Sequence, residues 1–118
     1  MKLFDYLAER GGTVELMALD GPQKEWDSPS VAVEAVLNNE RHISQRNNEI
    51  VDLAPAENDH ATTVILHWYV NEQVEEEATA DTLFHQVKMV EDSPHGLLMI
   101  DRELAGRPAP AATGTEAQ

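Results

Sequence analysis

Two Ser-Pro pairs constrain the fold of this chain more than any other feature. Serine caps helices and proline suits the first helical position, so Ser28-Pro29 predicts a helix start. Beyond it, apolar residues recur at steps of three, four and seven: Val33, Val36, Leu37, Ile43, Ile50 and Val51. This spacing predicts an amphipathic helix that ends at Ala54-Pro55, where proline removes a backbone donor.

A second long helix is expected between Asp59 and Asp92, with Asn58 or Asp59 as its cap and Ser93-Pro94 as its break. Its stripe also follows steps of three and four: Ile65, Tyr69, Glu72, Glu76, Thr79, Leu83, Val87 and Val90. No segment reads as a convincing strand, so the predicted fold class is all-α.

Shorter elements are expected around these two helices. Residues Met1–Arg10 predict a short helix that Gly11 and Gly12 stop, and His95–Ala105 predict another. Residues 13–27 have no clear period and are expected to form a long connection. The helical domain is therefore predicted over residues 1–105. Residues 106–118 are rich in proline, alanine, glycine and threonine and predict a disordered tail.

Composition excludes several classes of protein. The 118 residues include 8 basic and 22 acidic side chains, a net charge of −14, which opposes nucleic-acid binding and attracts cations. There is no cysteine, so disulfides, thiolate metal sites and a cysteine nucleophile are excluded. No membrane span or secretory signal is visible. The expected class is a small, acidic, cytoplasmic protein with no membrane partner.

Carboxylates interrupt both apolar stripes. Glu40 lies three residues from both Leu37 and Ile43, while Glu72 and Glu76 continue the stripe of the second long helix. A buried carboxylate is costly unless it is protonated or meets a cation. Carboxylates that converge from two helices suit hard cations, as in the di-iron or di-manganese sites of helical bundles. The pattern favours a metal site of this kind.

A second interpretation stays open from the residues alone. The run Glu75-Glu76-Glu77 also fits a charged, solvated helix face, although it spans most of the helix circumference and one member must then face the packing side. Trp68 and Tyr69 are expected to serve packing. The histidines show no paired spacing and are expected at the surface or at helix ends: His42, His60, His67, His85 and His95.

Several strings together resemble the bacterial non-haem ferritins over residues 2–105. They are residues 2–7 (KLFDYL), Ser28-Pro29, Asn39-Glu40, residues 68–77 (WYVNEQVEEE) and residues 100–104 (IDREL). Ferritins are four-helix bundles with a short fifth helix that assemble into hollow cages. The resemblance implies half of such a bundle: a helical stub, a long crossover loop, two long antiparallel helices and a short C-terminal helix.

The resemblance also implies the site. Ferritins oxidise iron(II) with dioxygen at a di-iron centre and store the iron(III) mineral. Glu40 and Glu76 match ligands of the second iron, Glu72 and Glu75 join Glu76 at an accessory iron site, and Gln73 lies beside the centre. The family's first helix and most of its second, with the remaining ligands, would precede Met1.

Two functions follow from the resemblance. The first is a ferroxidase and iron-storage subunit of a homo-oligomer, with iron(II) and dioxygen as its partners. The alternative is a truncated, catalytically impaired chain that binds iron or supports assembly, including as a homodimer in which two hairpins rebuild a four-helix bundle. Asn47 departs from the family, which usually has an apolar residue at this position.

Overall fold

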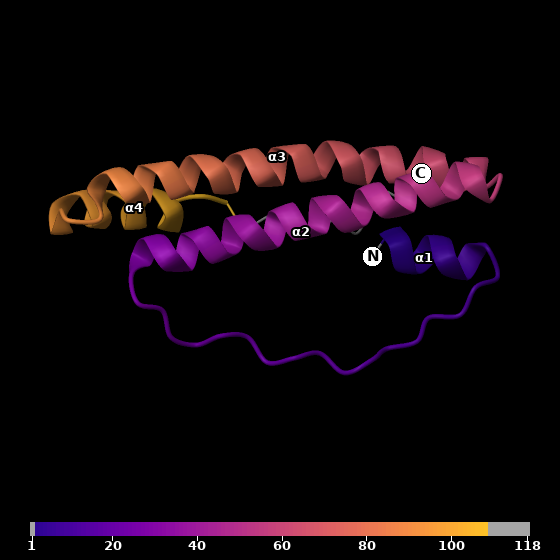
Figure 1. The fold of residues 1–118 in the computed structure, drawn as a ribbon, viewed down its shortest axis with the longest axis horizontal. Coiled ribbons are helices and arrows are strands. Elements are labelled where there is room, and N and C mark those ends of the chain that lie inside the picture. Colours follow the sequence, from indigo (N-terminus) through magenta and orange to yellow (C-terminus); the bar gives the residue numbers. More distant parts are fainter. Residues whose placement is uncertain (1, 109–118) are drawn as a thin grey trace.

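The structure is a computed structural model that describes residues 2–108 and contains only helices in that range. The helices are α1 (Lys2–Glu9), α2 (Pro29–Ala56), α3 (His60–Val90) and α4 (Pro94–Ala105). Helices α2 and α3 form a long antiparallel pair along the 53 Å axis of the molecule (Figure 1). The predicted all-α class is confirmed. The tail predicted for residues 106–118 lies, from residue 109 onward, outside the described residues.

The start of α2 matches the prediction, but its end does not. The Ser28 hydroxyl accepts a hydrogen bond from the Val31 backbone N–H at 3.3 Å, as a cap should. The predicted end at Ala54-Pro55 was wrong, because the helix continues to Ala56. Proline in the last turn removes only one backbone hydrogen bond, and the helix is closed beyond it.

A left-handed residue closes α2 and leads directly into α3. Asn58 has a φ of 56°, and its N–H donates to the Pro55 carbonyl at 3.0 Å. The Asp59 N–H donates to the Ala54 carbonyl at 2.8 Å, which completes a Schellman closure. The Asp59 carboxylate then caps α3 by accepting from the Thr62 N–H at 3.2 Å. One short turn therefore fixes the geometry of the hairpin.

The seam between α2 and α3 does not follow the stripe that the sequence predicted for α3. The buried residues of α3 recur every seventh position: Leu66, Gln73, Ala80 and Val87. Opposite them, α2 buries Ser30, Leu37 and Ala54. A seven-residue period is typical of long helices that pack at a shallow angle. Only Val87 belongs to both sets, and the rest of the predicted stripe is half-buried or exposed on the neighbouring face.

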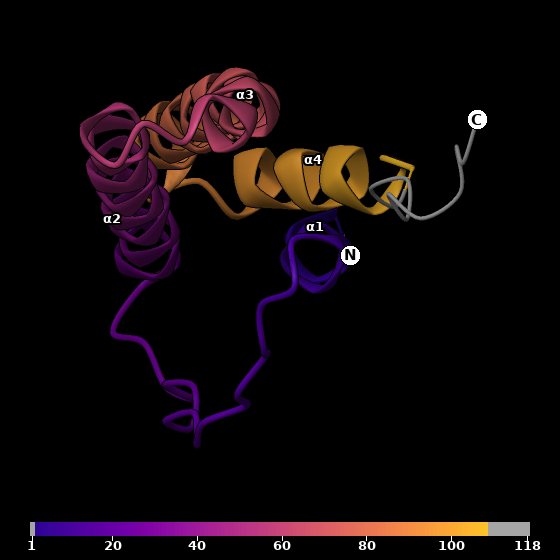
Figure 2. The ribbon, with the colours of Figure 1, turned by 90° about the vertical axis from the view of Figure 1, so that its right-hand side faces the viewer.

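Helix α1 lies against the first half of α3 and runs antiparallel to it. The Tyr6 hydroxyl lies 2.9 Å from the Thr62 hydroxyl, and Arg10 lies 3.4 Å from Asp59. The Lys2 ammonium lies 4.1 Å from the centroid of the Trp68 ring. Viewed along the long axis, α1 and α4 lie on the same side of the α2–α3 pair (Figure 2). These contacts leave most of the face between α2 and α3 without a covering helix.

The remaining elements are a cap and a connection. Helix α4 turns back on α3 at Gly96, where an added Cβ would lie 2.7 Å from the Val90 side chain. It begins at Pro94, one residue before the predicted start. Residues 13–27 form no helix or strand and bow away from the helices (Figure 1), which confirms the predicted connection. No helix within residues 2–108 is both long and apolar enough to cross a membrane.

Candidate metal centre

Glu40 is held at the α2–α3 seam by a buried amide. Gln73 is 9% exposed, and its Nε2 donates to Glu40 Oε2 at 2.8 Å and to the Glu40 backbone carbonyl at 2.9 Å. One carboxylate oxygen of Glu40 is thereby fixed by a neutral donor. The other oxygen, Oε1, has no hydrogen-bond partner among the described residues.

The acidic residues of α3 divide between two sides of the helix. Glu72 and Glu76 are one turn apart, and the helical register places both on the side of Tyr69, next to Gln73. Glu72 is half-buried, whereas Glu75 and Glu76 are exposed. Glu40, Glu72 and Glu76, together with Tyr69, define what we call the carboxylate face.

Glu77 takes the opposite side. It is half-buried, and its carboxylate accepts a hydrogen bond from the Ser44 hydroxyl of α2 at 2.7 Å. The member of the Glu75–Glu77 run that faces the packing side is therefore Glu77. The side chains of Glu75 and Glu76 are exposed, so these two residues fit the second interpretation, a charged and solvated helix face.

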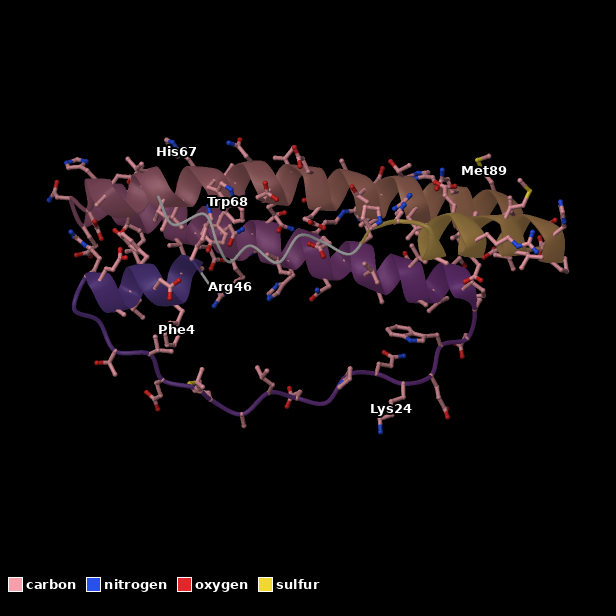
Figure 3. All side chains as sticks on the ribbon, turned by 180° about the vertical axis from the view of Figure 1, so that it is seen from behind. Phe4, Lys24, Arg46, His67, Trp68 and Met89 are labelled. Atoms are coloured by element: carbon pink, nitrogen blue, oxygen red, sulfur yellow. The ribbon has the colours of Figure 1, made fainter. Side chains whose placement is uncertain are left out.

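Aromatic residues border the carboxylate face where α1 covers α3. Trp68 and Tyr69 meet edge to face, with ring centroids 4.8 Å apart. Burial raises the pKa of the Tyr69 phenol above its usual value, and a hydrogen bond from the Leu3 backbone partly opposes this. The phenol is therefore protonated at neutral pH. In contrast, His67 points away from α2 (Figure 3) and is exposed, as expected of a surface histidine.

The predicted ligands do not gather into one cluster in the described part of the chain. Within residues 2–108, no group of three or more histidine, aspartate, glutamate or cysteine side chains is close enough to hold a metal ion. None of Glu40, Glu72, Glu75 and Glu76 forms an ion pair within that range. Their role as ligands stays a prediction, and the face carries negative charge that no neighbouring cation offsets.

The positions of Gln73 and Asn47 in this region do not follow from the sequence pattern. Gln73 was identified only as a neighbour of the centre, and its bond to Glu40 joins residues 33 positions apart. Asn47 was noted as unusual, and it lines a cavity beside Gln73. The signal for Gln73 was present in the sequence, since a polar residue occurs within a seven-residue series of buried positions.

Comparisons with known proteins agree on one family. The family model described as "Ferritin-like domain" matches residues 1–90. A bacterial non-heme ferritin of Bacteroides fragilis is 39% identical over 103 residues, which are 87% of this chain and 64% of the relative. One of Staphylococcus saprophyticus is 33% identical over 106 residues, 90% and 64% of the two chains. The chain thus spans 64% of the length of these curated relatives.

Solved structures show the same similarity. An Archaeoglobus fulgidus ferritin engineered to a closed form superposes with a TM-score of 0.89 at 42% identity, covering 92% of this chain and 66% of that chain. The open-pore ferritin of the same archaeon superposes with a TM-score of 0.88 at 43% identity, covering 91% and 66%. The helices described here therefore have the arrangement of the matching helices in these proteins.

Proposed function

Because the chain belongs to the ferritin-like family, we propose that it binds iron(II) as a substrate and takes part in iron oxidation and storage. The observation that carries this proposal is the bond between Gln73 and Glu40. A buried neutral donor orients the Glu40 carboxylate and leaves its charge intact. Glu72 and Glu76 lie on the adjoining side of α3, so the face offers several oxygen ligands to a hard cation.

The proposed roles follow from position. Glu40 and Glu76 bind iron at the ferroxidase-type centre, and Glu72 and Glu75 add an accessory site with Glu76. Carboxylates stabilise iron(III) more than iron(II), so they favour transfer of one electron from each iron to dioxygen. Gln73 holds one oxygen of Glu40, and Oε1 of that carboxylate binds the metal.

A second candidate is an iron-binding or assembly subunit with impaired turnover. The observation that favours it is the lack, within residues 2–108, of any cluster of three or more potential ligands. A complete centre then requires ligands from residues outside this range or from a second copy of the chain. Homo-oligomerisation can bring two carboxylate faces together. In a homodimer that rebuilds a four-helix bundle, the second copy would pack where α1 now lies. Helix α1 must therefore give up its contacts with Thr62 and Trp68 of α3.

Anaerobic titration with iron(II) tests the binding site. We expect Glu40→Gln plus Glu76→Gln to lower the number of iron ions bound per chain. The matched control is Glu34→Gln plus Glu57→Gln, which removes two charges from exposed positions of the same hairpin. Equal stoichiometry in the two double variants would overturn the assignment.

Admission of dioxygen then separates the two candidates. Oxidation at a rate comparable to that of a full-length bacterial non-heme ferritin, and lost in the Glu40→Gln plus Glu76→Gln variant, supports a ferroxidase. Iron binding with little oxidation supports the assembly subunit, because incomplete coordination lets iron leave before it reacts.

A further inference from the structure

A cavity of about 170 Å³ lies between α2 and α3, on the other side of Gln73 from Glu40. Its polar lining comes from Ser44, Asn47, Asn48, Gln73 and Glu77, and two valines of α3 complete it. Neither Glu40 nor Glu76 lines it. The Gln73 side chain separates the two regions, because it lines the cavity while its Nε2 bonds to Glu40.

The charge of Glu77 in this cavity is not compensated by the protein. Glu77 is half-buried, and the Ser44 hydroxyl is its hydrogen-bond partner. Within the described residues no lysine, arginine or histidine lies within ion-pair distance of it. Arg41 lines a neighbouring cavity with Glu77, but its guanidinium pairs with Asp81 at 3.7 Å. A partly buried carboxylate in this state favours a cation.

The other polar groups supply neutral oxygen atoms. The side chains of Asn47 and Asn48 form no hydrogen bond with any residue in the 2–108 range; Asn47 is half-buried and Asn48 is exposed. The enclosed side-chain oxygens without a partner in this range belong to Gln86 and Glu91, so the amides of Asn47 and Asn48 are open to solvent and to a hydrated ion. Carboxylate, amide and hydroxyl oxygens are the ligands that hard divalent cations prefer.

We propose that this cavity is a binding site for a hard divalent cation, with Glu77 as the charged ligand and Ser44, Asn47 and Asn48 as neutral oxygen ligands. The Ser44 hydroxyl donates to one oxygen of Glu77 and leaves the other for the metal. A water molecule takes up about 30 Å³, so the cavity admits the ion with several of its waters. Cations that keep most of their waters are commonly bound through one or two carboxylates.

Manganese(II) is the probe, measured by the electron paramagnetic resonance signal of the free ion. The starting protein is the full chain carrying Glu40→Gln plus Glu76→Gln, which silences the proposed iron site. We expect one manganese ion per chain to remain bound in the cavity. Adding Glu77→Gln should weaken this binding by at least about tenfold, equivalent to about 1.4 kcal/mol. Adding Asn47→Leu should weaken it by about threefold without changing the charge.

Glu34→Gln is the matched control, because it removes one charge from an exposed position of α2. It should change the affinity by less than about twofold, as expected of a screened surface charge. The proposal is overturned if Glu77→Gln and Glu34→Gln weaken binding equally. A failure of the proposed iron site is recognised separately, because the starting double variant would then bind as much metal as the unmodified chain.

A second measurement does not depend on how the Glu77 variant folds. Val70 and Val74 line the cavity, whereas Val14 and Val64 do not. In the starting protein, bound manganese(II) should therefore broaden the methyl NMR signals of Val70 and Val74 before those of Val14 and Val64. Broadening that is equal at all four valines, or strongest away from the cavity, would overturn the assignment.

Discussion

The side-chain amide of Gln73 donates to both the carboxylate and the backbone carbonyl of Glu40, at 2.8 and 2.9 Å. The same side chain is buried in the seam that joins α2 and α3. The group that orients a proposed iron ligand is therefore also a packing residue of the hairpin. Changes at this position should affect stability and metal binding together.

Replacing Gln73 with leucine should lower the free energy of unfolding by about 1–3 kcal/mol, because Glu40 then loses the donors to two of its oxygens. Urea denaturation of the metal-free chain measures this difference. Gln45→Leu is the control, since Gln45 is exposed and its amide lies 3.4 Å from Glu49 on the same helix. Equal destabilisation by the two variants would contradict the role given to Gln73.

Asp59→Asn should change how stability depends on pH. Hydrogen bonds from the Thr62 hydroxyl and backbone N–H, aided by Arg10, hold the pKa of Asp59 below its usual value of 3.8. A lowered pKa means that the ionised carboxylate stabilises the fold above pH 3.8. This contribution is lost as the pH falls through the lowered pKa.

The stability difference between the unmodified chain and Asp59→Asn should therefore be largest near neutrality and shrink below pH 3.8. Urea denaturation at several pH values between 2 and 7 records it. Asp52→Asn, at an exposed position of α2, should stay within about 0.5 kcal/mol of the unmodified chain at pH 7. A difference for Asp59→Asn that grows on acidification would contradict this account.

The turn between the long helices should tolerate glycine better than any branched residue. Asn58 has a φ of 56°, where residues with a Cβ are strained by about 1–2 kcal/mol and asparagine less so. Asn58→Gly should keep or raise the melting temperature, whereas Asn58→Val should lower it. If valine at this position were as stable as glycine, the Schellman closure would not be fixing the hairpin.

Metal should stabilise the folded chain. Manganese(II) or iron(II) that binds only the folded carboxylate face raises the free energy of unfolding, by about 2.7 kcal/mol at a metal concentration of one hundred times Kd. Thermal unfolding at neutral pH, with metal and then with excess chelator, measures the shift. Glu40→Gln plus Glu76→Gln should reduce it. A shift that persists in full would place the responsible metal elsewhere.

Local signals in the sequence were sufficient for most of the helix boundaries. Ser28, Asp59 and Ser93 each cap a helix through their own side chains, and these bonds join residues only three positions apart. Such contacts depend on neighbours in the chain, so the residue types alone indicate them. The end of α2 was missed because its closure depends on the left-handed conformation of Asn58.

The seam of α3 could not be predicted in the same way. Periodicity selects residues at steps of three and four, and in α3 this gave a stripe that begins at Ile65 and Tyr69. The side that packs on α2 instead contains Gln73 and Ala80, whose burial depends on hydrogen bonding and close approach to a partner helix. Similarly, the inward-facing glutamate of the Glu75–Glu77 run is Glu77, and the Ser44 hydroxyl that bonds to it lies 33 residues away in the sequence.

The connection over residues 13–27 also acts as a tether. Isolated helices shorter than about 12–15 residues are marginal in water, and α1 has 8 residues. Its side-chain contacts with α3 are few, so its binding there relies on the effective concentration that the tether imposes, about millimolar for a short flexible linker. Cleavage of the exposed connection, for example after Lys24, would turn this intramolecular contact into an ordinary bimolecular equilibrium. Helix α1 would then dissociate at micromolar protein concentration and uncover the first half of α3.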